Sequence, residues 1–190
     1  MKIRQLTRIG CGVRKFALRG FTLIELMVTV AVMVVLVIVA TPALNDATLG
    51  NRLTSYASRL MAGAYLARGE AIKRNALITL CASSNGTGCA TSGGWEQGWI
   101  VTCASNNSVT CTSGGTGSPI VFQRQGALPI GFKVISTDPL SLLFQPTGVG
   151  TTQATLKFCR TSPLGKQERQ VTIGATGGVS AKRTSTGSCS

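Results

Sequence analysis

An apolar segment near the start of the chain constrains its fold more than any other feature. Residues 26–45 hold no charged side chain over 20 consecutive positions. At a rise of about 1.5 Å per residue, a helix of this length spans roughly 30 Å, which is the thickness of the hydrocarbon core of a bilayer. The sequence therefore predicts one transmembrane helix close to the N-terminus.

The charges around this segment predict its orientation. Residues 1–20 hold six Lys or Arg and no acid, whereas the other 170 residues hold 13 basic and 6 acidic side chains, a net of +7. Positive charge beside a membrane helix stays in the cytoplasm. We therefore expect a single pass through a membrane, with residues 1–20 cytoplasmic and the rest on the far side, in a periplasm-like space. A net charge of this size argues poorly for nucleic-acid binding.

Two simpler interpretations of the segment are less satisfactory. A cleaved secretory signal peptide has a short basic region and an apolar core of about 7–15 residues. Here both regions are longer, and Ile38, Val39 and Ala40 form only a weak cleavage site. A plain uncleaved anchor leaves Glu25 unexplained, because a carboxylate inside hydrocarbon costs about 2.5–3.5 kcal/mol.

Glu25 needs a partner that the segment itself does not contain. No Lys or Arg lies within a helical turn of it inside the span. A cut between Gly20 and Phe21 creates a new α-amine four residues away. The amine of a neighbouring, axially offset subunit can then pair with Glu25, which neutralises both charges and sets the register of assembly.

The stretch "RGFTLIEL", residues 19–26, resembles the type III signal of type IV pilins and type II secretion pseudopilins. The resemblance implies that residues 1–20 are a leader, that prepilin peptidase cuts after Gly20, and that Phe21 is then N-methylated. It also implies that Glu25 is the assembly carboxylate. Pro42 resembles the proline that bends the helix at the end of the apolar stretch in many pilins.

Beyond the membrane segment we expect the helix to continue to about Asn75, with Glu70 and Arg74 paired at i, i+4. A helical stripe predicts the face that packs on the protein's own sheet: Leu49, Leu53, Tyr56, Leu60, Ala64, Ala67 and Ala71. After it, short β-rich runs alternate with turn residues, and no βαβ rhythm appears. The predicted strands are 77–82, 98–103, 119–124, 131–136, 141–145, 153–159, 169–174 and 178–182.

The predicted fold class is therefore α+β, with a long N-terminal helix packed on a C-terminal antiparallel β-sandwich or sheet. The expected domains are a leader (1–20), a transmembrane half-helix (21–44), an amphipathic half-helix (45–76) and a periplasmic β domain (77–190). Trp95 and Trp99 lie in what we interpret as a Gly-rich hairpin, where we expect them to cover the sheet edge instead of forming a ligand cage.

Two further stretches resemble the GspH/FimT group of minor pilins, namely "LARGEAIKRNALITLCAS" (66–83) and "GGWEQGWIVTC" (93–103). This resemblance implies a structural subunit of a type IV pilus or a type II secretion pseudopilus. The implied partners are prepilin peptidase, other minor pilins, the major pilin or pseudopilin, the inner-membrane assembly platform and membrane lipid. The pattern does not distinguish the two machines.

Six cysteines remain once Cys11 leaves with the leader: Cys81, Cys89, Cys103, Cys111, Cys159 and Cys189. An even number in an oxidising compartment predicts disulfides, and six cysteines allow 15 pairings. Proximity favours Cys81–Cys89, Cys103–Cys111 and Cys159–Cys189. A zinc site is disfavoured because the chain has no histidine and no CxxC.

We predict no enzymatic activity and no cofactor. The absence of histidine removes the commonest general base, and the acids after Glu25 are isolated in sequence. The Gly-rich "TSGGTGSP" (112–119) lacks the Lys and Ser/Thr of a phosphate-binding loop.

DNA uptake is the alternative function. Some FimT-type pilins bind DNA through a GRxR motif near the C-terminus, but the corresponding stretch here, "TGGVSAKR" (176–183), has Gly178 and Ser180 where the arginines stand. A basic patch is still conceivable from five side chains: Arg160, Lys166, Arg169, Lys182 and Arg183. A solvated surface is the interpretation we favour; binding, if it occurs, should be to phosphates and salt-dependent.

Overall fold

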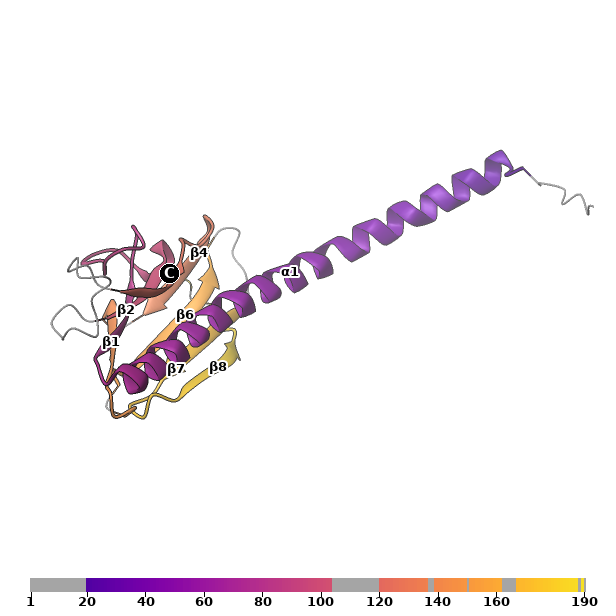
Figure 1. Cartoon of the computed structure of the whole chain (residues 1–190). Helices are drawn as coiled ribbons and strands as arrows, with labels where there is room; N and C mark the ends of the chain where they lie inside the picture. Colours follow the sequence, from indigo (N-terminus) through magenta and orange to yellow (C-terminus); the bar gives the residue numbers. More distant parts are fainter. Residues whose placement is uncertain are drawn as a thin grey trace, which may run out of the picture. The chain divides into compact units, whose positions relative to one another are not determined.

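The computed structural model describes residues 20–103, 120–136, 139–149, 151–161, 167–187 and 189, with the side chains of Pro42 and Ala43 excepted. The chain divides into two compact units, Met1–Thr41 and Pro42–Ser190. One helix, α1 (Leu23–Arg74), contributes to both (Figure 1). Each unit is described by itself.

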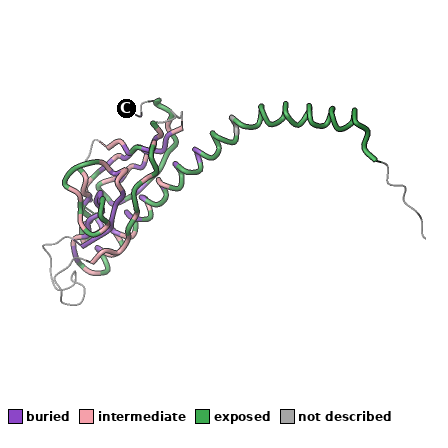
Figure 2. The backbone as a smooth tube through the Cα atoms, turned by 90° about the horizontal axis from the view of Figure 1, so that it is seen from above, coloured by how far each residue is buried: buried purple, intermediate pink, exposed green. Residues whose placement is uncertain are grey.

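In the first unit, α1 is exposed along its whole length, and its apolar side chains have no protein covering them (Figure 2). The hydroxyls of Thr29 and Thr41 donate to carbonyl oxygens of the preceding turn, at 2.9 and 2.7 Å, so that these polar groups are satisfied within the helix. Among the described residues, α1 is the one helix whose length and composition suit a membrane crossing, with a mean hydropathy of 2.9 in its most apolar window.

In the second unit, α1 buries the predicted stripe. Leu53, Leu60, Ala64, Ala67 and Ala71 are fully buried. Tyr56 is half-buried, and its ring meets the ring of Phe132 edge-on at 5.4 Å. Because most of the stripe toward its C-terminal end is alanine, the helix backbone lies close to the sheets.

The end of α1 is fixed by local signals. Asn75 adopts a left-handed conformation (φ 50°), and the N–H of Ala76 donates to the carbonyl of Ala71 at 3.2 Å. This is the geometry in which a helix ends with a left-handed residue and its last carbonyls stay satisfied. The predicted Glu70–Arg74 pair is present, at 2.6 Å.

Two four-stranded antiparallel sheets follow the helix (Figure 1). The first has the order β3-β2-β1-β5, and the second has the order β4-β6-β7-β8. The strands are β1 (Ile78–Ala82), β2 (Trp99–Cys103), β3 (Val121–Gln125), β4 (Phe132–Ser136), β5 (Ser141–Phe144), β6 (Ala154–Arg160), β7 (Glu168–Ile173) and β8 (Val179–Thr184). The α+β fold and all eight predicted strands are confirmed, with their ends within two residues of the predicted ones.

The core joins the helix and both sheets, and the tryptophans lie inside it. Trp95 sits in a short 3-10 helix, η1 (Trp95–Gln97), and Trp99 begins β2; their side chains are 1% and 0% exposed. The ring of Trp99 lies 6.2 Å from that of Phe158 on β6, edge to face. The prediction that they cover a sheet edge is wrong, because β2 is an inner strand of its sheet.

Candidate functional site

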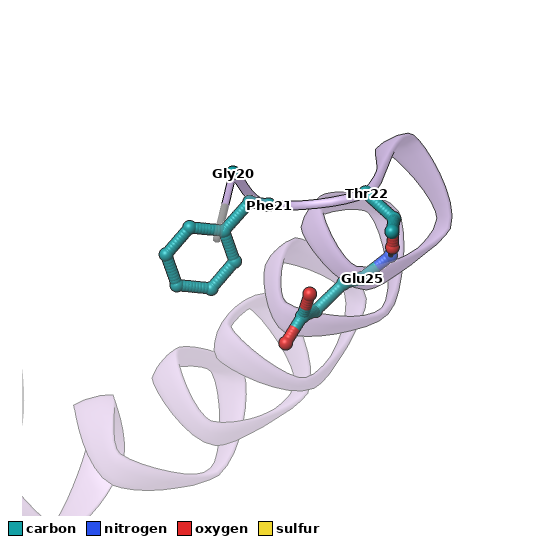
Figure 3. A pocket seen from close by; sticks show the side chains of 4 residues that line it. All are labelled: Gly20, Phe21, Thr22 and Glu25. Atoms are coloured by element: carbon teal, nitrogen blue, oxygen red, sulfur yellow. Dashed lines mark hydrogen bonds between the residues drawn. The ribbon is translucent and has the colours of Figure 1, made fainter. Parts of the chain in front are cut away.

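The first candidate site is the start of α1, where the residues expected for processing and assembly lie together. Thr22 immediately precedes the helix, and its hydroxyl accepts a hydrogen bond from the backbone N–H of Glu25 at 3.3 Å (Figure 3). Its carbonyl accepts the first helical bond from Leu26 at 3.1 Å. Thr22 is therefore the N-cap, and Thr-x-x-Glu matches the capping-box pattern. Thr22 was not predicted as a site residue, although this pattern identifies it.

Glu25 occupies the third position of the helix, where a carboxylate interacts favourably with the helix dipole. With Gly20, Phe21 and Thr22 it lines a hollow of about 510 Å³ (Figure 3). Glu25 forms none of the ion pairs found in the described part of the chain. The Gly20–Phe21 bond thus lies exposed beside the helix start, next to a carboxylate with no cation of its own among the described residues.

The other expectations for the N-terminal region are untested by the structure. Residues 1–19 lie outside the described part, so the leader, including Cys11, stays a prediction. The helix passes through position 42, and the bend predicted for Pro42 also stays a prediction.

Disulfides hold the second unit at two places. Cys81 on β1 is bonded to Cys89, and Cys159 on β6 is bonded to Cys189 near the C-terminus. Cys103 on β2 is disulfide-bonded as well. Cys111, the partner predicted for it, lies outside the described residues.

The described members of the predicted basic patch do not all lie on one face of the sheet. Lys166 lies outside the described residues, and Arg169 is only 6% exposed, so it is a buried side chain. Lys182 and Arg183 are both exposed, but as consecutive strand residues they point to opposite faces of the sheet. Arg160 lies with its guanidinium 5.9 Å from the ring centre of Phe132. The members that the structure describes therefore offer no single continuous row of cations for a phosphate backbone.

Arg169 instead connects β7 to α1. Its Nε donates to the hydroxyl of Thr54 at 3.0 Å, and its Nη2 donates to the carbonyl of Gly50 at 3.5 Å. Its Nη1 donates to the carbonyl of Glu168 at 3.0 Å. Burial, followed by the charge of Arg183 opposite it on β8, lowers the pKa of the Arg169 guanidinium. Arginine nevertheless remains protonated at neutral pH.

Glu168 is the neighbouring buried charge, and its side chain is 1% exposed. Burial raises the pKa of Glu168, but hydrogen bonds from Thr186 and Thr184 and the charge of Lys157 outweigh it, so that the pKa lies below the ordinary value. The Lys157 Nζ lies 3.9 Å from the carboxylate. Sequence reasoning treated Glu168 as an isolated acid, and no local pattern reveals its partners.

The described residues contain no group of three or more His, Cys, Asp or Glu side chains arranged to hold a metal ion. Glu70 is paired with Arg74, and Glu168 is enclosed by threonines. The feature with the clearest functional meaning is therefore the helix start around Glu25.

Comparison with solved structures finds a minor pilin with a similar fold. The type IV minor pilin FimU of Pseudomonas aeruginosa superimposes with a TM-score of 0.50 at 18% identity, over 68% of this chain and 92% of that chain. The minor pseudopilin EpsH of the Vibrio cholerae type 2 secretion system superimposes with a TM-score of 0.48 at 14% identity, over 68% of this chain and 95% of that chain. No curated protein matches the sequence.

Two family patterns match the sequence itself. The prokaryotic N-terminal methylation motif matches residues 18–41, which include Gly20, Phe21 and Glu25. The pattern of the type II transport protein GspH matches residues 56–177, which is more than half of the chain and spans the C-terminal part of α1 and most of both sheets. The chain therefore belongs to the GspH family, whose members are pilin-like structural proteins.

Proposed function

We propose that this protein is a minor subunit of a type IV pilus or of a type II secretion pseudopilus. The observation that carries the proposal is that one chain combines the methylation motif at residues 18–41 with the GspH pattern at residues 56–177. The methylation motif suits a subunit that is cut and methylated at the membrane. The GspH pattern suits a domain that contacts other subunits.

The proposed sequence of events begins in the inner membrane. The leader, residues 1–20, holds the precursor with its basic end in the cytoplasm and its β domain in the periplasm. Prepilin peptidase cuts between Gly20 and Phe21, and Phe21 is methylated. The mature protein then has a membrane half-helix (21–44), an amphipathic half-helix (45–76) and a β domain (77–190).

Glu25 then directs assembly. A buried carboxylate in hydrocarbon costs about 2.5–3.5 kcal/mol, and this cost disappears when the carboxylate pairs with the amine of a neighbour's mature N-terminus. The exposed position of Glu25 at the helix start supports such a pairing. The apolar side chains of α1 pack against lipid before assembly and against the helices of the major and minor subunits afterwards. The inner-membrane assembly platform moves the subunit between these states.

We propose a structural role without catalysis. The family consists of structural pilins and not of enzymes. The alternative of DNA uptake finds no support in the positions of Arg169, Lys182 and Arg183, because the first is buried and the other two face opposite ways.

Mass spectrometry of the chain isolated from sheared surface fibres, or from an overproduced pseudopilus, tests this function. We expect a polypeptide that begins with N-methyl-Phe21 and that co-purifies with other pilin subunits. A chain that begins at Met1 or downstream of Ala40, or one that never leaves the membrane fraction, contradicts the proposal. The chain produced in a host that lacks prepilin peptidase serves as the unprocessed reference.

A further inference from the structure

A groove of about 290 Å³ lies between α1 and the last two strands. On the helix side it is lined by Thr54, Ala57 and Ser58. On the strand side it is lined by Arg169 of β7 and by Ala181, Lys182 and Arg183 of β8. Figure 1 shows β7 and β8 beside this part of the helix. Arg169 and Arg183 lie on the same face of the sheet, whereas Lys182 points to the other face. Two cations and two hydroxyls therefore border one small volume.

Arg169 has donors left for a ligand in this groove. A guanidinium carries five N–H groups, and the bonds to Thr54, Glu168 and Gly50 use one each on Nε, Nη1 and Nη2. One N–H on each terminal nitrogen thus has no acceptor in the described part of the chain. This is the number of donors that a bidentate carboxylate takes up.

The charge of the groove is also uncompensated within the described residues. No carboxylate there forms an ion pair with Arg169, Lys182 or Arg183. Arg183 stands directly opposite Arg169 in the β7–β8 register, so that two like charges share one face of the sheet. A buried charge is costly until it is paired. An incoming anion therefore relieves both the burial of Arg169 and its repulsion by Arg183.

We propose that this groove receives an Asp or Glu side chain from a neighbouring pilin subunit in the fibre. The inference rests on the proposed function and adds the chemistry of one lateral contact. Between Asn45, the last residue of the charge-free stretch, and Thr54, α1 rises about 14 Å. Lipid headgroups extend only roughly 5–8 Å beyond the hydrocarbon, so a subunit surface reaches the groove more readily than a lipid phosphate does.

Photo-cross-linking of the full chain in its native host tests the proposal. The cross-linkable residue p-benzoylphenylalanine replaces Ser58, an exposed residue of the groove. We expect a cross-link to a peptide of another pilin subunit that contains Asp or Glu. Arg183→Glu should lower its yield about tenfold, as expected for reversing one charge at an interface. When the partner's Asp or Glu is replaced by Lys, the cross-link yield of the chain that carries Arg183→Glu should be restored.

Controls separate this proposal from the function on which it rests. Arg124→Glu reverses an exposed arginine on β3, away from the groove, and should leave the yield unchanged. A cross-linker at Val35, on the exposed membrane half of α1, reports incorporation into the fibre. Two outcomes overturn the groove proposal alone, provided that the Val35 cross-links persist. In the first, Ser58 captures only lipid, DNA or an acid-free peptide. In the second, Arg183→Glu does not change the yield of the Ser58 cross-link. Loss of the Val35 cross-links to pilin helices in the unaltered chain overturns the proposed function and the groove proposal with it.

Discussion

The carboxylate of Glu168 accepts hydrogen bonds from both the backbone N–H and the hydroxyl of Thr186, at 3.1 and 2.8 Å. The hydroxyl of Thr184 adds another at 3.1 Å. Since Arg169 faces the helix, the adjacent Glu168 points to the opposite face of the sheet. The C-terminal segment after β8 is thus held on that outer face by one buried carboxylate and by the Cys159–Cys189 bond.

We predict that Glu168→Gln lowers the free energy of unfolding by about 1–3 kcal/mol at pH 7, because it removes the charge on which these hydrogen bonds converge. The pKa of Glu168 is lowered in the folded state, so its stabilisation is present at neutral pH and is lost as the pH falls below about 4.3. Urea unfolding of the full chain in detergent, followed through the buried Trp95 and Trp99, measures both effects.

The exposed Asp46 provides the control for this prediction, since Asp46→Asn removes an acid whose side chain is solvated. The wild-type protein and Asp46→Asn should lose stability in parallel as the medium is acidified, whereas Glu168→Gln should lose less. Identical slopes for all three proteins show that Glu168 contributes nothing through its charge.

The two disulfides between described cysteines should stabilise the fold to different extents. Cys159–Cys189 closes a loop with a sequence separation of 30, and Cys81–Cys89 closes one of 8. Loop-closure entropy assigns about 3.7 kcal/mol to the longer loop and about 2.5 kcal/mol to the shorter one. We therefore expect paired Cys→Ser changes at 159 and 189 to lower the urea midpoint more than those at 81 and 89. The reverse order indicates that strain or residual structure dominates.

Local patterns made most of the fold predictable. The spacing of Leu53, Leu60 and Ala64 predicts the buried face of α1, and the strand runs are bounded by turn residues that mark their ends. The order of strands in the sheets is set by long-range pairing, such as that of β1 with β5, which no local pattern encodes. For this reason the interior position of Trp99 and the burial of Arg169 were predicted wrongly.

The two candidate sites also differ in how far they can be predicted from the sequence. Gly20, Phe21 and Glu25 lie within six residues of one another, so their motif is visible in the sequence. The groove beside Arg169 combines Thr54 with Arg183, which are 129 positions apart (183 − 54). Only folding brings them together, and sequence proximity suggested an exposed patch instead.

The alanines of α1 allow a matched test of its close packing. Ala64 is fully buried against the core, and Ala62 is exposed on the same helix. Ala64→Leu forces extra volume into a packed interior and should cost about 1–3 kcal/mol or prevent folding. Ala62→Leu should change stability by less than about 0.5 kcal/mol. Equal unfolding midpoints for the two variants contradict a tightly packed helix–sheet contact.

Glu25 has two possible physical roles, and three substitutions separate them. As a capping residue at the third helical position it is replaceable by glutamine, which suits the same pattern. As a charge that pairs with a neighbour's amine, Glu25 cannot be replaced by glutamine, because glutamine is neutral. We expect Glu25→Gln and Glu25→Val to remain in the membrane fraction, because the apolar span is unchanged, while their amount in sheared fibres falls about tenfold or more.

Thr22→Val completes this comparison, because it removes the hydroxyl that accepts from the Glu25 backbone and leaves the carboxylate in place. Loss of an N-cap costs about 0.5–2 kcal/mol locally. The first turn of a helix anchored in lipid tolerates that cost, so Thr22→Val should enter fibres at close to the wild-type level. Quantitative immunoblots of the fibre and membrane fractions provide the measurement. If Glu25→Gln enters fibres normally and Thr22→Val does not, Glu25 acts by starting the helix and the charge-pairing step is wrong.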